Sequence, residues 1–214
     1  MKFLLFDTET TGLPKNKNGR IDDSDNWPYI VQLSWILYDD VDNVITLSND
    51  IVKLKNIQEL TETSIKIHGI TQEKSINTGK PIKEVILNFQ TALSVTDVVI
   101  AHNLFFDKRI VMAECSRNKM RHEFYNSKQY YCTMKNSVNI CKIKTISKTG
   151  EEYYKYPKLE QLHEHLFNKK PYGTHDALVD VLICLRCYCK IEHNYDIFTR
   201  NEKINTLMKE LCKL

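Results

Sequence analysis

Residues 2–12 read KFLLFDTETTG, a short apolar run that passes directly into acidic and turn-forming residues. The run is too brief for a helix and predicts a buried strand over residues 2–7. Alternation along a strand directs Asp7 and Glu9 to the same face, where two close carboxylates repel each other unless a cation lies between them. A tight turn is predicted next, at Thr10, Thr11 and Gly12.

The rest of the chain alternates between strand patterns and helix patterns. Further strands are predicted over residues 30–38, 44–53, 97–101 and 129–133, and helices over residues 81–94, 106–119, 134–141, 158–167 and 177–190. This order predicts an α/β fold around one sheet. The helix before the fourth strand allows that strand to lie parallel to the first.

A second group of polar residues follows the fourth predicted strand. In IAHNLFFD, residues 100–107, the strand ends at His102 and Asn103, and a helix begins near Asp107. If this strand is parallel and adjacent to the first, Asp107 emerges at the same carboxyl edge of the sheet as Asp7. The alternative is that Asn103 caps the helix and Asp107 complements the helix dipole. For Asn103 both interpretations stay open.

A third group lies in YGTHDALVDV, residues 172–181. His175 comes just before a predicted helix, and Asp180 interrupts the apolar pattern in its first two turns. Burying a lone carboxylate is costly, and a metal ion would compensate it. By itself, His175 reads as an ordinary histidine at a helix start. Taken together, the three groups predict an oxygen-rich site for Mg²⁺ or Mn²⁺, formed by Asp7, Glu9, Asp107 and Asp180 with His175 beside it.

These three motifs resemble the DEDD superfamily of 3′-to-5′ exonucleases, in its histidine branch, which includes the proofreading (epsilon) subunit of bacterial DNA polymerase III. The motifs are FDTETTG, HNLFFD and HDALVD, and in the third the histidine is separated from the aspartate by four residues. The sister branch has a tyrosine at the position of Asp176. IHGIT at 67–71 and KLEQLHEHLF at 158–167 are also similar to the polymerase-proofreading group, so the resemblance covers about residues 3–185.

The resemblance implies a ribonuclease H-like fold, with a central mixed sheet of about five strands and helices on both faces. It implies an exonuclease domain over residues 1–190, and we expect residues 191–214 to form a helical extension packed on it. It further implies two divalent cations, one held by Asp7, Glu9 and Asp180 and the other by Asp7 and Asp107, with His175 as the general base. The expected substrate contacts are Thr8, Thr10, Thr11, Gly12, Leu13, His102, Asn103 and Phe106.

The expected activity is hydrolysis of DNA from a single-stranded or frayed 3′ end, which releases nucleoside 5′-monophosphates. An RNA 3′-end exonuclease of the same superfamily is an alternative, because the motifs do not distinguish the two nucleic acids. A second alternative is a proofreading subunit whose partner is a DNA polymerase. An inactive nucleic-acid binder is disfavoured because every motif acid is present.

Composition predicts an intracellular protein, either cytoplasmic or, if viral, in the host cell. The N-terminal apolar run is shorter than that of a signal peptide, and no segment is long enough to span a membrane. Seven cysteines without regular spacing favour reduced thiols over disulfides. Cys184, Cys187 and Cys189 lie in an apolar helix pattern, which favours burial over zinc binding.

The stretch from Lys142 to Lys158 combines five lysines with Tyr153, Tyr154 and Tyr156. Charge and aromatic stacking of this kind can bind a nucleic-acid strand. The interpretation we favour is a solvated, lysine-rich loop or hairpin.

Overall fold

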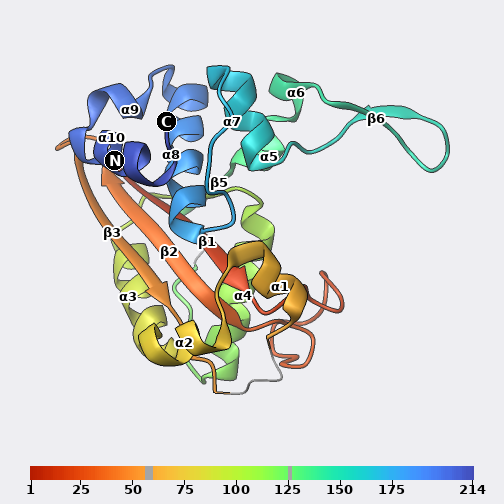
Figure 1. Ribbon diagram of the computed structural model, residues 1–214, viewed down its shortest axis with the longest axis vertical. Coiled ribbons are helices and arrows are strands. Elements are labelled where there is room, and N and C mark those ends of the chain that lie inside the picture. Colours follow the sequence, from red (N-terminus) through yellow and green to blue (C-terminus); the bar gives the residue numbers. More distant parts are fainter. Residues whose placement is uncertain (56–59, 125–126) are drawn as a thin grey trace.

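The computed structural model describes residues 1–55, 60–124 and 127–214, and its centre is a five-stranded sheet in the order β3-β2-β1-β4-β5 (Figure 1). β1 pairs antiparallel with β2 and parallel with β4, which itself pairs parallel with β5. The predicted parallel pairing of the first and fourth strands is therefore confirmed. The strands are β1 (Lys2–Thr10), β2 (Ile30–Asp39), β3 (Val44–Ile51), β4 (Val98–Ala101) and β5 (Gln129–Cys132).

Helices cover both faces of this sheet, as predicted. They are α1 (Glu62–His68), α2 (Gln72–Thr78), α3 (Ile82–Ser94), α4 (Leu104–Arg117), α5 (Thr133–Asn136), α6 (Val138–Cys141), α7 (Leu159–Phe167), α8 (Ala177–His193), α9 (Ile197–Arg200) and α10 (Glu202–Leu211).

Each face of β1 packs into a different hydrophobic core. Phe3 and Leu5 point to one side, where they join a cluster formed largely by α8 and α10. Leu4 and Phe6 point to the other side, against residues of α3 and α4. Burial of a strand on both faces explains why its apolar run is continuous.

Several elements differ from the predicted ones. The first strand continues to Thr10, so Asp7 and Glu9 lie within it. The helix predicted over residues 134–141 is two single turns, α5 and α6. The Ser137 hydroxyl, between them, donates to the carbonyl of Thr133 at 2.6 Å, and such back-bonding competes with helix continuation. α1 and α2 were not predicted.

A two-stranded hairpin stands apart from the central sheet (Figure 1). Its strands are β6 (Lys144–Ile146) and β7 (Glu152–Tyr154), and they project from the body between α6 and α7. This segment is the lysine-rich stretch for which a loop or hairpin was the favoured interpretation.

The C-terminal segment packs on the core. Ile204 and Met208 of α10, and Cys212 after it, are fully buried in the same cluster as Phe3 and α8. Within the described residues, no helix combines the length and apolar character that a membrane span requires.

Candidate active site

The alternation of β1 places two acids opposite α8. Phe3 and Leu5 on this face pack against α8, and Asp7 and Glu9 continue the same face toward the end of the strand. Sheet pairing sets Asp7 beside Ser34 and Glu9 beside Gln32 of β2. The two carboxylates therefore face the N-terminal turns of α8.

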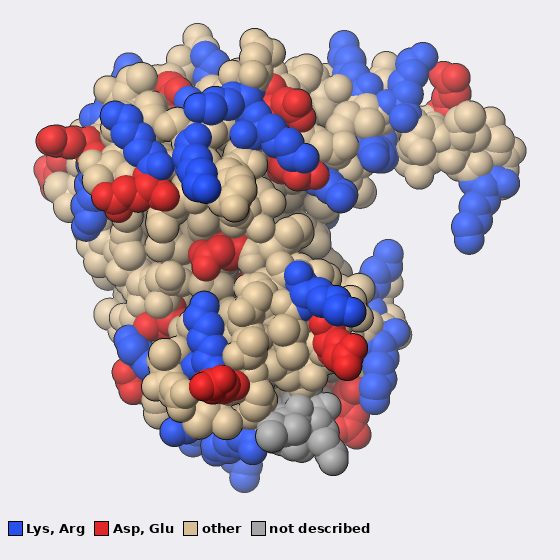
Figure 2. Space-filling view, in the orientation of Figure 1, with Lys and Arg blue, Asp and Glu red and all other residues tan. Residues whose placement is uncertain are grey.

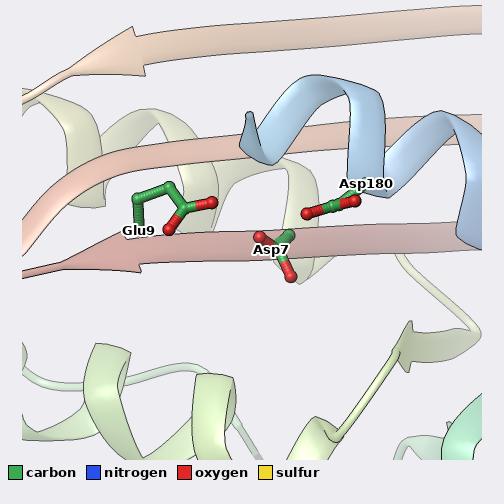
Figure 3. A group of neighbouring side chains, drawn as sticks. All are labelled: Asp7, Glu9 and Asp180. Atoms are coloured by element: carbon green, nitrogen blue, oxygen red, sulfur yellow. The ribbon is translucent and has the colours of Figure 1, made fainter. Parts of the chain in front are cut away.

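Asp180 reaches the same place from α8. The helix begins at Asp176, whose side chain accepts hydrogen bonds from the N–H groups of Leu178 and Val179. Gln32 fixes this start to the sheet, because its Oε1 accepts from the Ala177 N–H at 3.2 Å. Asp180 lies one turn after the cap and points toward β1 (Figure 3).

Three carboxylates form one cluster, as Figure 3 shows. Asp7, Glu9 and Asp180 each offer an oxygen, and these atoms all lie within 4.8 Å of one another. The three side chains are partly buried. Two of them come from β1 and the third from α8, so the packing of the start of α8 against the end of β1 creates the cluster.

Asp107 approaches β1 from α4. Its side chain is buried, and its Oδ1 accepts hydrogen bonds from the Thr8 hydroxyl at 2.8 Å and from the Thr8 N–H at 3.2 Å. Thr8 lies between Asp7 and Glu9 in the chain, so these bonds hold Asp107 against the acidic strand. Asp107 is close enough to Asp7 to raise its pKa, although it is not part of the tight three-acid cluster.

Burial raises the pKa of all four acids, and repulsion by neighbouring carboxylates adds to it. The pKa of Asp7 lies well above its ordinary value, first because of burial and then because of Asp107, Asp180 and Glu9. Burial, followed by the charge of Asp180, raises the pKa of Glu9 to about 8. Burial raises the pKa of Asp107 to about 7, against the opposing effect of its Thr8 hydrogen bonds. The pKa of Asp180 is also raised to about 7, mainly by burial.

This donor set fits a hard divalent cation. Among the described residues, no lysine, arginine or histidine forms an ion pair with any of the four acids. Clustered carboxylates without a cationic side chain are costly to ionise, and a bound divalent ion removes that cost. All the donors are oxygens, the ligands that Mg²⁺, Mn²⁺ and Ca²⁺ prefer.

His175 reaches the cluster through its backbone. Its N–H donates to Oδ2 of Asp180 at 3.1 Å, and its φ of 76° places it in a left-handed turn just before α8. The residue is exposed. The structure thus brings the main chain of His175 to Asp180, while its imidazole lies at the surface.

The predicted substrate residues of the first motif form the end of β1 and the loop after it. Thr10 donates through its hydroxyl to the carbonyl of Gly12 at 2.7 Å. The Thr11 hydroxyl accepts from the Tyr29 N–H, which ties the loop to the start of β2. Leu13 is 82% exposed directly after this turn, so a large apolar side chain faces solvent near the acids. Thr8 differs from the others because its hydroxyl is already bonded to Asp107.

The predicted substrate residues of the second motif have mainly internal partners. His102 lies between Thr133 and Pro157, with its Nδ1 3.0 Å from the Thr133 hydroxyl and its Nε2 3.1 Å from the Pro157 carbonyl. Burial lowers the pKa of His102 to about 4, so the ring is neutral and Nε2–H donates to the carbonyl. Asn103 adopts a φ of 73° and makes no side-chain cap to α4, and Phe106 is partly buried in the first turn of that helix.

The positioning roles of two polar residues, Gln32 and Asp176, were not predicted from the sequence. Gln32 is 2% exposed, and its amide Nε2 donates to Asn49 at 2.8 Å and to Asp176 at 3.3 Å. Asp176 is the helix cap of α8. A lone glutamine within the apolar stretch IVQLSWILY was the available signal, since buried polar groups need partners.

Comparison with known proteins identifies the fold and the family of the chain. A search of curated protein sequences found no significant match. The chain is similar in structure to Escherichia coli Exonuclease I in complex with a dT13 oligonucleotide, with a TM-score of 0.65, 15% identity, and coverage of 90% of this chain and 42% of that one. It is likewise similar to Exonuclease I from Methylocaldum szegediense, with a TM-score of 0.64, 18% identity, and coverage of 96% of this chain and 42% of that one.

At these identities the structural likeness shows the fold alone, and this chain spans about two-fifths of the length of those enzymes. The family is shown separately by the sequence. The model of the exonuclease family RNase_T matches residues 4–188, a range that contains all three acidic motifs. The chain therefore belongs to this exonuclease family, within the DEDD superfamily of metal-dependent 3′-to-5′ exonucleases.

Proposed function

We propose that this protein removes nucleoside 5′-monophosphates one at a time from the 3′ end of single-stranded or frayed DNA. The observation that carries the proposal is the convergence of Asp7, Glu9, Asp180 and Asp107 at one edge of the sheet, without a cationic partner among the described residues. DNA is favoured because similar solved structures, such as Exonuclease I of E. coli, hold DNA oligonucleotides.

Asp7, Glu9 and Asp180 are the proposed ligands of one Mg²⁺ or Mn²⁺ ion, and Asp7 and Asp107 those of a second. When bound, two such cations activate water, stabilise charge on the phosphate and neutralise the leaving oxygen. Neighbouring residues hold the carboxylate ligands in place. Thr8 orients Asp107, and the Asp176 cap holds the first turn of α8, which carries Asp180.

His175 is the proposed general base. Its main chain is bonded to Asp180, so the residue lies beside the carboxylate cluster, and its side chain is exposed. The test of this role has to separate an effect on the chemical step from an effect on the binding of the DNA strand. Replacement of His175 by Gln is expected to lower kcat by a factor of roughly 100 to 10,000 while the affinity for a DNA strand in Ca²⁺ changes little. A variant with a wild-type kcat would remove His175 from this role.

The loop after β1 is the proposed binding site of the terminal nucleotide. Leu13 presents an apolar surface to the last base, and Gly12 has no atom within 4 Å of the position that a Cβ would take, which leaves its backbone open to the sugar. Both residues follow Glu9 closely, so a nucleotide at this loop has its phosphate near the acids.

The direct test uses DNA and RNA strands of equal sequence, each labelled at the 5′ end. With Mg²⁺ or Mn²⁺, the protein is expected to convert the DNA strand into a ladder that shortens stepwise from the 3′ end. A faster ladder on RNA would instead support the alternative substrate. A block at the 3′ hydroxyl should protect the strand, whereas degradation of blocked and free strands at equal rates would contradict 3′-end recognition.

A further inference from the structure

The hairpin arm, residues 142–158, is an exposed, positively charged feature of the described chain. It carries five lysines and two glutamates, an excess of positive charge equal to the net charge of +3 of the entire protein. The rest of the chain is therefore neutral by formal count. Attraction to a polyanion is concentrated in a segment that the catalytic cluster does not use.

The two faces of the arm each combine a tyrosine with a lysine. Lys144 pairs directly with Tyr154 across the hairpin, so these side chains lie on one face. Tyr153 lies on the other face, beside Lys155 two residues later. The turn between the strands contains Gly150, whose φ of 88° suits glycine. Its backbone is closed by hydrogen bonds from the Ser147 N–H to the Glu151 carbonyl and from the Gly150 N–H to the Ser147 carbonyl.

The apolar side chains of the arm contribute little to the core. The exposed fractions are 67% for Ile146, 51% for Tyr153, 41% for Tyr154 and 57% for Tyr156. A two-stranded hairpin without a packed face is only marginally stable in water, and a group of neighbouring exposed apolar side chains can mark a binding surface. Packing in the core therefore does not explain why these tyrosines are present in the arm.

The base of the arm is fixed to the catalytic edge of the sheet. His102, which follows β4 and precedes Asp107 by five residues, donates through Nε2 to the carbonyl of Pro157 at the end of the arm. The other ring nitrogen contacts Thr133 at the start of α5. The arm thus leaves the body next to the second acidic motif.

The space beside the arm is open. Figure 2 shows that the molecule is hollowed between the arm and the body below it, and that lysine and arginine atoms lie on both borders of this hollow. Because the base of the arm is bonded to His102 beside the second acidic motif, a strand with its 3′ end at the acids can extend along this face. Single-stranded nucleic acid is held in proteins by positive grooves and by aromatic side chains on which bases stack.

We propose that the hairpin arm binds the single-stranded part of the substrate on the 5′ side of the cleaved bond, with bases stacked on Tyr153 or Tyr154 and phosphates near the lysines. This inference rests on the proposed exonuclease function. A protein partner fits the arm less well, because lysine is depleted at the centres of protein interfaces, whereas here lysines alternate with the tyrosines.

The test compares a 20-nucleotide DNA strand with a small ester, the p-nitrophenyl ester of thymidine 5′-monophosphate, which is too short to reach the arm. Replacing Tyr153 and Tyr154 with Ala is expected to weaken strand binding in Ca²⁺ by roughly 5- to 100-fold. Hydrolysis of the ester in Mn²⁺ should stay at the wild-type rate. Tyr153→Phe with Tyr154→Phe keeps the rings, and should bind the strand as the wild type does.

Charge is tested by a second pair of variants. Lys144→Gln with Lys148→Gln should reduce the slope of log Kd against log salt by about 0.7 for each phosphate that the variant no longer neutralises. The matched control is Lys53→Gln with Lys83→Gln. Both of these lysines are exposed, and Lys83 lies on α3, at the opposite side of the molecule from the arm in Figure 1.

The outcomes separate the two proposals. Loss of strand binding with intact ester hydrolysis supports the arm, and the alanine, glutamine and phenylalanine variants should all keep the wild-type Tm. Wild-type strand binding in both the alanine and the lysine variants overturns the arm proposal, whatever protein the arm then binds. If the wild-type protein hydrolyses neither substrate, the proposed exonuclease function fails instead.

Discussion

The hydroxyl of Thr8 donates a 2.8 Å hydrogen bond to Oδ1 of Asp107, across 99 residues of sequence. Thr8 sits on β1 between Asp7 and Glu9, and Asp107 sits in the first turn of α4. One buried bond therefore couples the acid of the second motif to the strand that carries the acids of the first. Its strength decides how well the fourth carboxylate is oriented.

Thr8→Val removes this bond and keeps the shape of the side chain. Because groups that orient metal ligands typically change activity or metal affinity by about 10- to 100-fold, kcat or the affinity for Mn²⁺ is expected to fall by a similar factor. Mn²⁺ titration of the exonuclease rate measures both. Thr8→Ser keeps the hydroxyl and is the control. Equal metal dependence in the valine variant and the wild type would show that Asp107 needs no such orientation.

Metal binding is expected to stabilise the protein strongly. At Mn²⁺ concentrations roughly 100 times its Kd, the free energy of unfolding rises by about 2.7 kcal/mol, which corresponds to an increase in Tm of about 5–10 °C. Asp180→Asn removes one repelling carboxylate, so in EDTA this variant should melt above the wild type. Thermal unfolding with and without Mn²⁺ checks both effects. If Mn²⁺ raises the Tm of the Asp180→Asn variant as much as it raises that of the wild type, the ion binds elsewhere.

Acid stability is expected to depend on a buried histidine that is not one of the proposed ligands. His163 of α7 donates through Nδ1 to the Lys169 carbonyl at 2.7 Å, and its Nε2 accepts from Arg186, which pairs with Asp196. Burial, opposed by the Lys169 bond, lowers the pKa of His163 from 6.5 to about 4. The fold thus favours the neutral ring, so its contribution is complete above the ordinary pKa and is lost as pH falls from about 6.5 to about 4.

The loss amounts to on the order of 3 kcal/mol of unfolding free energy at the acidic end of this window. Urea unfolding at pH values of about 7 and about 4.5 measures it in the wild type and in His163→Gln, where the dependence on pH should be smaller. His165→Gln, at an exposed position of the same helix, is the matched control. A glutamine variant that loses as much stability as the wild type between the two pH values would rule out this origin.

Gln32→Leu tests the link between the sheet and α8. The change removes the acceptor of the Ala177 N–H and the donor to Asn49 and Asp176, inside a buried region. A buried group without a partner costs about 1–3 kcal/mol, so the free energy of unfolding should fall by that amount, and kcat should fall because α8 carries Asp180. Gln129→Leu, at the exposed start of β5, should change neither. Unchanged stability and rate in the Gln32 variant would remove its positioning role.

The sequence predicted the parts of the fold that depend on continuous apolar patterns. β1, β4 and α8 each have a long apolar face or run, and the acids of the motifs interrupt or end these patterns. α1 and α2 were missed because they are short and bury mainly polar residues such as Ser64 and Ser75. Their capping threonines were present, but no apolar stripe accompanied them.

The cluster of acids was predictable, whereas its supports were not. Strand alternation alone brings Asp7 and Glu9 to one face, and the order of elements brings Asp180 to the same edge. The bonds from Thr8 to Asp107 and from Gln32 to the start of α8 join residues 99 and 145 positions apart. Such partners depend on packing in three dimensions and leave only a weak trace in the sequence, a polar residue at a buried position.

The most direct measurement of the central claim is the anomalous scattering of Mn²⁺ in crystals of this protein soaked with a nucleoside 5′-monophosphate. We expect anomalous peaks bonded to carboxylate oxygens of Asp7, Glu9 and Asp180, with a second peak toward Asp107 and the nucleotide phosphate between the ions. Manganese bound only at other acids, with these four carboxylates free of metal, would contradict the account.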